Sequence, residues 1–121
     1  MRIAEAATLC GLSPDTIRYY EKSGMLPPIQ RGSDGNRRYT SENVNWLTIL
    51  YWLRQTGMSM KVMQRYAVLV HAGDHTVDER ISILRDHGIA LTQRRKDLDR
   101  CEELLARKLN AYSAIKSHTR D

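Results

Sequence analysis

The chain has 121 residues, which is long enough for one domain with a modest hydrophobic core, or for one domain with an appendage. Its 19 lysines and arginines outnumber its 14 aspartates and glutamates, and this surplus favours a polyanionic partner without identifying it. The two cysteines, Cys10 and Cys101, show no pairing pattern and no apolar run could span a bilayer, so we exclude a disulfide scaffold and a membrane partner and expect a cytoplasmic protein.

Two short helices joined by a glycine turn are expected at the start of the chain. Apolar residues recur with helical spacing over residues 2–9, and Gly11 closes this first helix. Ser13 then provides an N-cap for a second helix, which has Pro14 in its first position and ends at Gly24. This is a helix-turn-helix arrangement, whose second helix can lie in the major groove of DNA.

The outer face of the second helix carries the candidate DNA contacts. Ile17 suits the core, and Tyr20 either joins it or faces DNA with its hydroxyl. An arginine can hold a phosphate or a guanine edge with two hydrogen bonds, and a tyrosine hydroxyl can reach a phosphate oxygen. The side chains expected to face DNA are Thr16, Arg18, Tyr19 and Lys22.

Turn residues dominate the segment after this helix. Residues 27–40, PPIQRGSDGNRRYT, place Ser-Asp-Gly-Asn between short flanks, which predicts a β-hairpin that we call the wing. A third helix, capped by Thr40 or Ser41, is expected to reach Gln55, and a fourth is expected over residues 59–71. The residues of the third helix expected to face inward are Val44, Leu47, either Leu50 or Tyr51, and Leu53.

The second half of the chain predicts one long helix that needs a partner. Thr76 and Glu79 match a capping box, and after them only Gly88 interrupts the helical pattern. Leucines recur at heptad spacing, which is typical of a coiled-coil seam and predicts a homodimer. The predicted seam residues are Val77, Ile81, Leu84, Leu91, Leu98, Leu105, Leu109 and Tyr112.

Polar residues in the companion heptad row indicate the direction of pairing. A parallel pair would set Arg95 against Arg95 and Glu102 against Glu102, whereas antiparallel helices could set Arg95 against Glu102 of the partner. We therefore prefer an antiparallel coiled-coil dimer. The alternative, in which these residues lie at solvated edges of the seam, stays open.

A known family shares these motifs. The segment IAEAATLCGLSPDTIRYYEKSGMLPP, followed by Arg37 and Tyr39 in the wing and by LRQTGMSM at residues 53–60, resembles the MerR family of bacterial transcription regulators. The resemblance covers nearly the whole chain, and the TIRYYE run followed by GMLPP is its most specific part.

This resemblance implies roles for particular residues. It implies that Arg18 and Tyr19 lie at the major groove and that Tyr20 reaches the DNA backbone. It also implies that Arg37 and Tyr39 contact DNA from the wing. Arg54 matches a basic family position near the centre of the operator, whereas Asn36 departs from the family, which often has an aromatic residue before the wing arginine.

The resemblance also implies a mechanism. Such regulators bind, as two-fold dimers, to a palindrome between two promoter elements that are too far apart for RNA polymerase. The activated dimer bends and undertwists this spacer, so that polymerase can engage both elements. We expect no enzyme, because the sequence contains no catalytic triad, carboxylate pair or phosphate-binding loop.

The effector is not evident from the sequence. We expect no cofactor and no metal, because the cysteines of the family's metal and iron–sulfur sensors are missing and Gly73 separates His71 from His75. The chain is similar to the branch that responds to aldehydes or nitrosative stress, but Trp52 stands at the usual sensor-cysteine position. Cys101 is a candidate redox or effector residue, although a structural role is favoured.

The expected fold is mostly α-helical. It has a winged helix-turn-helix domain over residues 1–73, with a small β-wing, and a coiled-coil dimerisation helix over residues 74–121. The expected function is a dimeric transcription regulator that distorts promoter DNA. Two alternatives stay open: an architectural or excisionase-like DNA-bending protein, and a coiled-coil interaction protein with an incidental basic head.

Overall fold

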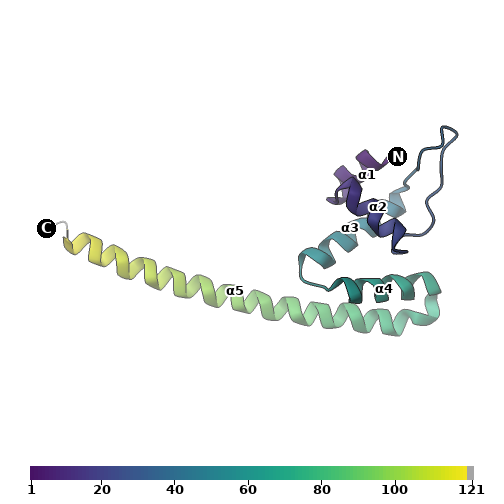
Figure 1. Cartoon of the computed structure of the whole chain (residues 1–121). Coiled ribbons are helices and arrows are strands. Elements are labelled where there is room, and N and C mark those ends of the chain that lie inside the picture. The colour runs from purple at the N-terminus through teal and green to yellow at the C-terminus, as the bar shows by residue number, and fades with distance from the viewer. Residues whose placement is uncertain (120–121) are drawn as a thin grey trace. The chain divides into compact units, whose positions relative to one another are not determined.

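The computed structural model describes residues 1–119 and divides into two compact units, Met1–Leu84 and the part that begins at Arg85. The first unit extends past residue 73, where a domain limit is expected from the sequence, because the first turns of the last helix pack within it. The elements shown in Figure 1 are α1 (Ile3–Cys10), α2 (Pro14–Lys22), α3 (Ser41–Gln55), α4 (Met60–Ala72), the short 3-10 helix η1 (Asp74–Thr76) and α5 (Val77–Thr119).

The turn between α1 and α2 forms as local sequence chemistry predicts. Gly11 ends α1 with φ +88°, and a Cβ at this position would lie 3.3 Å from the ring of Tyr51. The Ser13 hydroxyl then accepts a hydrogen bond from the Thr16 amide at 3.1 Å, which satisfies one free N–H at the start of α2. The helix-turn-helix is therefore fixed by residues within the turn itself.

The starts of α3 and α4 are also capped by side chains. Thr40, rather than Ser41, caps α3, and it forms a capping box in which its hydroxyl accepts from the Asn43 amide and Asn43 accepts from the Thr40 amide. Ser59 caps α4 by accepting from the Val62 amide at 3.2 Å.

The capping box predicted at the start of α5 is wrong, because η1 precedes this helix. The Thr76 hydroxyl donates to the carbonyl oxygens of Leu69 at 2.6 Å and Gly73 at 2.8 Å, so it ties η1 to the end of α4. The Glu79 carboxylate accepts from Arg65 of α4 at 2.8 Å. Both side chains predicted to cap α5 therefore join α4 to η1 and α5.

The core of the first unit lies among α1, α2, α3 and α4. Ile17 of α2 and Leu47 and Leu50 of α3 have no exposed surface, and Tyr51 is only half-buried, so Leu50 is the inward residue of that pair. Trp46 stacks on Tyr66 of α4 at a centroid distance of 5.7 Å. The hydrophobic residues buried in this core are Ala6, Ala7, Cys10, Ile17, Tyr20, Met25, Leu26, Tyr39, Val44, Leu47, Leu50, Leu53, Met58, Met63, Tyr66 and Ala67.

The wing contains less β-structure than expected. Among the described residues its only strand-like pairing is a single antiparallel bridge between Arg31 and Arg37. Its tip is closed by the Gly35 amide, which donates to the carbonyl of Gly32 at 3.0 Å. Figure 1 shows it as a narrow loop that stands away from the helices between α2 and α3. With two glycines at so short a tip, the ladder does not extend into strands.

The helix α5 runs without interruption over 43 residues. Beyond Leu91 all its described residues are exposed, including apolar side chains such as Leu98, Leu105 and Tyr112. No helix within residues 1–119 combines the length and the apolar character needed to span a membrane.

Candidate nucleic-acid interface

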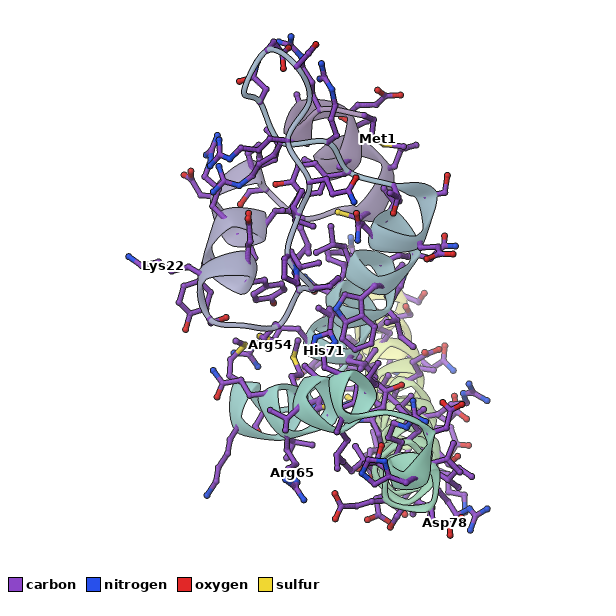
Figure 2. All side chains as sticks on the ribbon, turned by 90° about the vertical axis from the view of Figure 1, so that its right-hand side faces the viewer. Met1, Lys22, Arg54, Arg65, His71 and Asp78 are labelled. Atoms are coloured by element: carbon purple, nitrogen blue, oxygen red, sulfur yellow. The ribbon has the colours of Figure 1, made fainter. Side chains whose placement is uncertain are left out.

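The outer face of α2 presents a set of polar side chains to solvent. Arg18 is 57% exposed and pairs with Asp15 at 2.9 Å, one helical turn earlier. Tyr19 is 54% exposed, and the Thr16 hydroxyl shares a hydrogen bond of 2.9 Å with the capping Ser13. Figure 2 shows Lys22 extending from α2 into solvent. These side chains are free to meet a partner because Ile17 and Tyr20 hold the opposite face of α2 in the core.

Tyr20, which the sequence places either in the core or at the DNA, is buried in the core. Its side chain is 3% exposed, and burial raises the pKa of its hydroxyl, an effect that the charge of Arg54 opposes. Arg54 lies near the end of α3, where its guanidinium donates to the carbonyl of Met58 at 3.3 Å. Arg54 is exposed, and Figure 2 shows it between Lys22 and His71.

An ion pair attaches the wing to α2. The Nε of Arg37 donates to Glu21 at 2.8 Å, and Glu21 is the more buried partner, with 19% of its side chain exposed. The hydrogen bond to Glu21 raises the pKa of the Arg37 guanidinium above its ordinary value. The pair fixes the wing arginine beside α2 and leaves its terminal nitrogens available.

Tyr39, which the resemblance implies contacts DNA from the wing, is a buried residue. Its side chain is 2% exposed, and its hydroxyl oxygen is buried without a hydrogen-bond partner. Burial is also the main reason that the pKa of its hydroxyl is raised. The Tyr39 backbone exchanges two hydrogen bonds of 2.7 Å with Met1, so this end of the wing is fastened to the start of the chain and the ring is held in the core.

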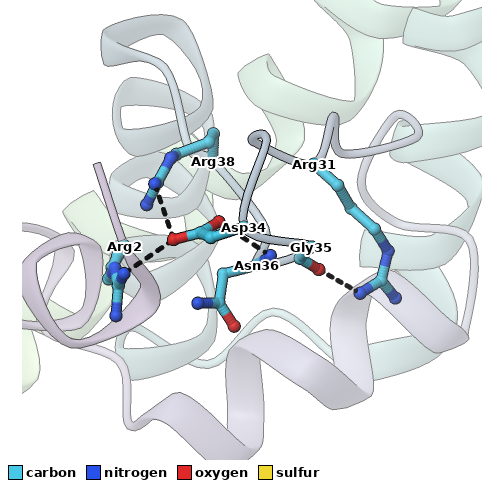
Figure 3. Close-up of polar contacts among 6 residues, drawn as sticks. All are labelled: Arg2, Arg31, Asp34, Gly35, Asn36 and Arg38. Atoms are coloured by element: carbon cyan, nitrogen blue, oxygen red, sulfur yellow. Dashed lines mark hydrogen bonds and ion pairs between the residues drawn. The ribbon is translucent and has the colours of Figure 1, made fainter.

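Asp34 organises the tip of the wing, as Figure 3 shows. Its Oδ2 accepts from Arg2 at 2.7 Å and from Arg38 at 3.0 Å, and its Oδ1 accepts from the Asn36 amide at 3.0 Å. The bond from the Asn36 amide is the largest cause that lowers the pKa of Asp34 to about 2, and both arginines add to it. Arg31 braces the same loop by donating to the Gly35 carbonyl at 2.8 Å.

These contacts enclose a cleft between the start of α1, the helix α2 and the wing. We call it the arginine cleft; its volume is about 290 Å³. Four of the residues that line it are arginines and none is acidic. Its lining residues are Arg2, Ile3, Ala4, Arg18, Arg31, Asn36, Arg37 and Tyr39.

The cleft brings together three residues predicted from the sequence and adds others that sequence reasoning missed. Arg18, Arg37 and Tyr39 all line it, whereas Thr16, Tyr19, Lys22 and Arg54 do not. Arg2 and Arg31 were missed because only tertiary contacts bring them beside α2. The three arginines within residues 31–38 were the one sequence signal that could have indicated Arg31.

No metal or redox site stands out beside this surface. Within residues 1–119 there is no group of three or more His, Cys, Asp and Glu side chains arranged to hold a metal ion. The Nε2 of His71 lies 3.4 Å from the Met25 carbonyl oxygen. Cys10 is buried and Cys101 is exposed, and both are free thiols.

Known proteins resemble this chain in sequence. The family model described as "MerR HTH family regulatory protein" matches residues 1–67. The chain is 38% identical over 114 residues to an uncharacterized HTH-type transcriptional regulator of Haemophilus influenzae, covering 94% of this chain and 84% of that protein. It is 38% identical over 86 residues to the HTH-type transcriptional regulator AdhR of Bacillus subtilis, covering 71% of this chain and 61% of AdhR.

A solved structure agrees with the sequence relatives. The crystal structure of HiNmlR, described as a MerR family regulator lacking the sensor domain and bound to promoter DNA, matches with a TM-score of 0.85 and 37% identity. The match covers 96% of this chain and 92% of HiNmlR. Because the family model, the relatives and this structure agree over the helix-turn-helix, the chain belongs to the MerR family of helix-turn-helix transcriptional regulators.

Proposed function

We propose that this regulator binds, as a homodimer, to a palindrome in a promoter spacer and controls transcription by distorting that DNA. The observation that carries the proposal is that a basic side chain of α2 and a basic side chain of the wing lie on one surface. Arg18 on the exposed face of α2 and Arg37 of the wing line the same cleft, and Glu21 holds Arg37 there. An α-helix and a flanking wing presented on one side suit the major groove and the adjacent backbone of one half-site.

The helix α5 supports dimerisation. Its seam residues Leu98, Leu105 and Leu109 are between 58% and 65% exposed in a single chain. Burying one leucine against a second copy contributes about 1.5–3 kcal/mol, so a seam of several leucines favours association. Antiparallel pairing is preferred because it would set Arg95 against Glu102 of the second copy.

A dimer that binds two half-sites can deform the DNA between them. Phosphate contacts at both ends can hold the spacer bent or undertwisted, and the deformation energy then depends on the spacer sequence. RNA polymerase is the partner that would respond to such a change. The HiNmlR structure bound to promoter DNA supports the DNA partner.

The effector remains open in this proposal. Trp52, 58% exposed on α3, carries no thiol that an electrophile could modify, so a response through this position is not expected. A bound small molecule is one candidate signal, and the exposed Cys101 is the other.

Selection of binding sites from a random duplex library tests the function and does not require a known operator sequence. We expect an enriched palindrome, protection of both half-sites in footprinting, and slower migration when the site lies at the centre of a longer fragment, as bending predicts. Enrichment of bent DNA without sequence preference would favour the architectural alternative. No DNA binding at all would leave the coiled-coil interaction protein.

A double substitution tests the dimer. Leu91→Glu together with Leu98→Glu should dissociate the protein in analytical ultracentrifugation, since two charges on each helix would face the seam. The monomer should hold one half-site, with about half the salt dependence of binding. If this variant stays dimeric, the seam lies on another row of α5.

A further inference from the structure

We propose that Asp34 is a positioning residue for DNA binding, because it holds the tip of the wing against the start of α1 before any DNA is bound. The inference rests on the proposed function and extends it to an acidic side chain. By its charge alone, an aspartate on this basic surface would oppose the binding of a polyanion. Its hydrogen bonds give it the opposite effect.

Three donors from separate places in the chain converge on the Asp34 carboxylate, as Figure 3 shows. Arg2 precedes α1 and lies 32 positions away in the sequence, and its guanidinium donates to Oδ2 at 2.7 Å. Arg38, on the returning side of the wing, donates to the same oxygen at 3.0 Å. The Asn36 amide donates to Oδ1 at 3.0 Å. One side chain therefore closes the wing on itself and joins its tip to the start of α1.

Backbone pairing gives the wing little support of its own. Within the described residues the wing has one antiparallel bridge, between Arg31 and Arg37, and none of residues 30–38 belongs to the hydrophobic core. A two-stranded hairpin with so little pairing is marginally stable in water. The ion pair from Arg2 to Asp34 therefore supplies the tip with a connection to a helix that the bridge does not provide.

The path of the Arg38 side chain shows how closely the parts of the wing fit. A Cβ placed on Gly32 would lie 2.7 Å from the Arg38 Nε, so the Arg38 side chain crosses directly over the Gly32 backbone on its way to Asp34. Only glycine leaves room for this approach without a shift of the side chain. The wing therefore contains both the acceptor, Asp34, and the small residue that lets Arg38 reach it.

A wing that is ordered before binding favours affinity. Arg31 is held by the Gly35 carbonyl and Arg37 by Glu21, both at 2.8 Å, so the basic groups of the wing already have defined positions. An ordered loop loses less conformational freedom on binding than a mobile one, so ordering offsets less of the interaction free energy. Asp34 contributes to affinity in this way without any contact of its own with DNA.

The charge of Asp34 and its bonds affect binding with opposite signs. The negative charge repels phosphate, but Arg2 and Arg38 share this one carboxylate, so the three side chains together keep a positive charge. The repulsion is reduced for this reason, and the loss of order in the wing is the larger effect of removing the carboxylate. The sign of the change in affinity therefore distinguishes positioning from simple electrostatics.

Asp34→Asn in the full-length protein tests the inference, with Asp15→Asn as the matched control. Each substitution removes one negative charge that pairs with arginine, but Asp15 bonds Arg18 on its own helix and joins no other element through that bond. If charge alone mattered, both variants would bind a labelled duplex of arbitrary sequence more tightly. We expect Asp34→Asn to bind about threefold to tenfold more weakly at fixed salt, and Asp15→Asn to bind at least as tightly as the wild type.

Amide hydrogen exchange in the free protein measures the order of the wing directly. The Gly32 amide donates to the Asn36 carbonyl at 2.8 Å and the Arg38 amide donates to the Gln30 carbonyl at 2.7 Å, so both report on pairing within the wing. Both amides should exchange faster in Asp34→Asn than in the wild type. The Ile17 amide of α2 should exchange at the same rate in both proteins.

Gly32→Ala provides a second variant that leaves the charge of the protein unchanged. Its methyl group would displace the Arg38 guanidinium from Asp34, while the pair between Arg2 and Asp34 remains. Affinity should therefore fall by a smaller factor than in Asp34→Asn. Thermal unfolding checks the fold of each variant, and if Asp34→Asn does not fold, wild-type affinity in Gly32→Ala would overturn the inference.

The outcomes separate this inference from the proposed function. If the wild type binds the duplex and a folded Asp34→Asn binds it as tightly or more tightly, Asp34 has no positioning role, although the regulator still binds DNA. Equal weakening in Asp15→Asn, or unchanged exchange of the Gly32 and Arg38 amides, would also overturn the inference. If the wild type binds no duplex, the proposed function fails and the positioning role fails with it.

Discussion

Arg18→Ala separates the function of α2 from its folding. The side chain of Arg18 is 57% exposed and that of its partner Asp15 is 95% exposed, so their pair contributes little to stability. We expect the free energy of unfolding to change by no more than about 0.5 kcal/mol. Affinity for DNA should nevertheless fall by about 1–3 kcal/mol for each half-site if the guanidinium contacts a base edge or a phosphate.

The measurement is fluorescence anisotropy with the selected palindrome at fixed salt, beside thermal unfolding followed by circular dichroism. Arg18→Lys distinguishes the two kinds of contact, because lysine keeps the charge for a phosphate but loses the fork that suits guanine. Asp15→Asn is the control, since it releases Arg18 and should leave affinity equal or higher. A change of less than about twofold for Arg18→Ala, with an intact fold, would refute the assignment.

Three further outcomes follow from other features. Gly11→Ala should destabilise the protein by about 1–2 kcal/mol in urea denaturation, because φ is +88° and a Cβ would meet Tyr51 at 3.3 Å; an unchanged midpoint would contradict this. Since folding lowers the pKa of Asp34 from 3.8 to about 2, its stabilising effect is complete above pH 3.8 and is lost as the pH falls through about 2. The Asn36 amide resonance should follow this titration, and Asp34→Asn should abolish it. Cys101→Ser should leave the response to electrophiles unchanged in a transcription assay, and lost induction would make Cys101 the sensor.

Local chemistry made the helices of the first unit predictable. Ser13, Gly11 and Ser59 act on neighbours within a few residues, so their cap and turn roles can be recognised from sequence alone. The prediction at Thr76 failed for the opposite reason. Its hydroxyl has two acceptors near the end of α4, and only the packed structure shows that these bonds form instead of a cap.

The candidate site was predictable only in part. Arg18 and Tyr19 face solvent because helical periodicity sets their direction, and periodicity is visible in the sequence. The wing has no such regular repeat, so the burial of Tyr39 and the position of Arg31 depend on contacts with the start of the chain and with the wing's own tip. Residues that meet only through such contacts cannot be grouped from their spacing.

The two tryptophans of the chain offer separate optical reporters. Trp46 is partly buried, stacks on Tyr66, and donates its indole N–H to the Met25 carbonyl at 2.7 Å, whereas Trp52 on the same helix is 58% exposed. In the Trp52→Phe variant, Trp46 is the remaining tryptophan, so the wavelength of tryptophan emission would report the unfolding of the core around it. In the Trp46→Phe variant, quenching of Trp52 by iodide would measure how accessible the outer side of α3 is to solvent. A molecule that binds to this side would reduce the quenching.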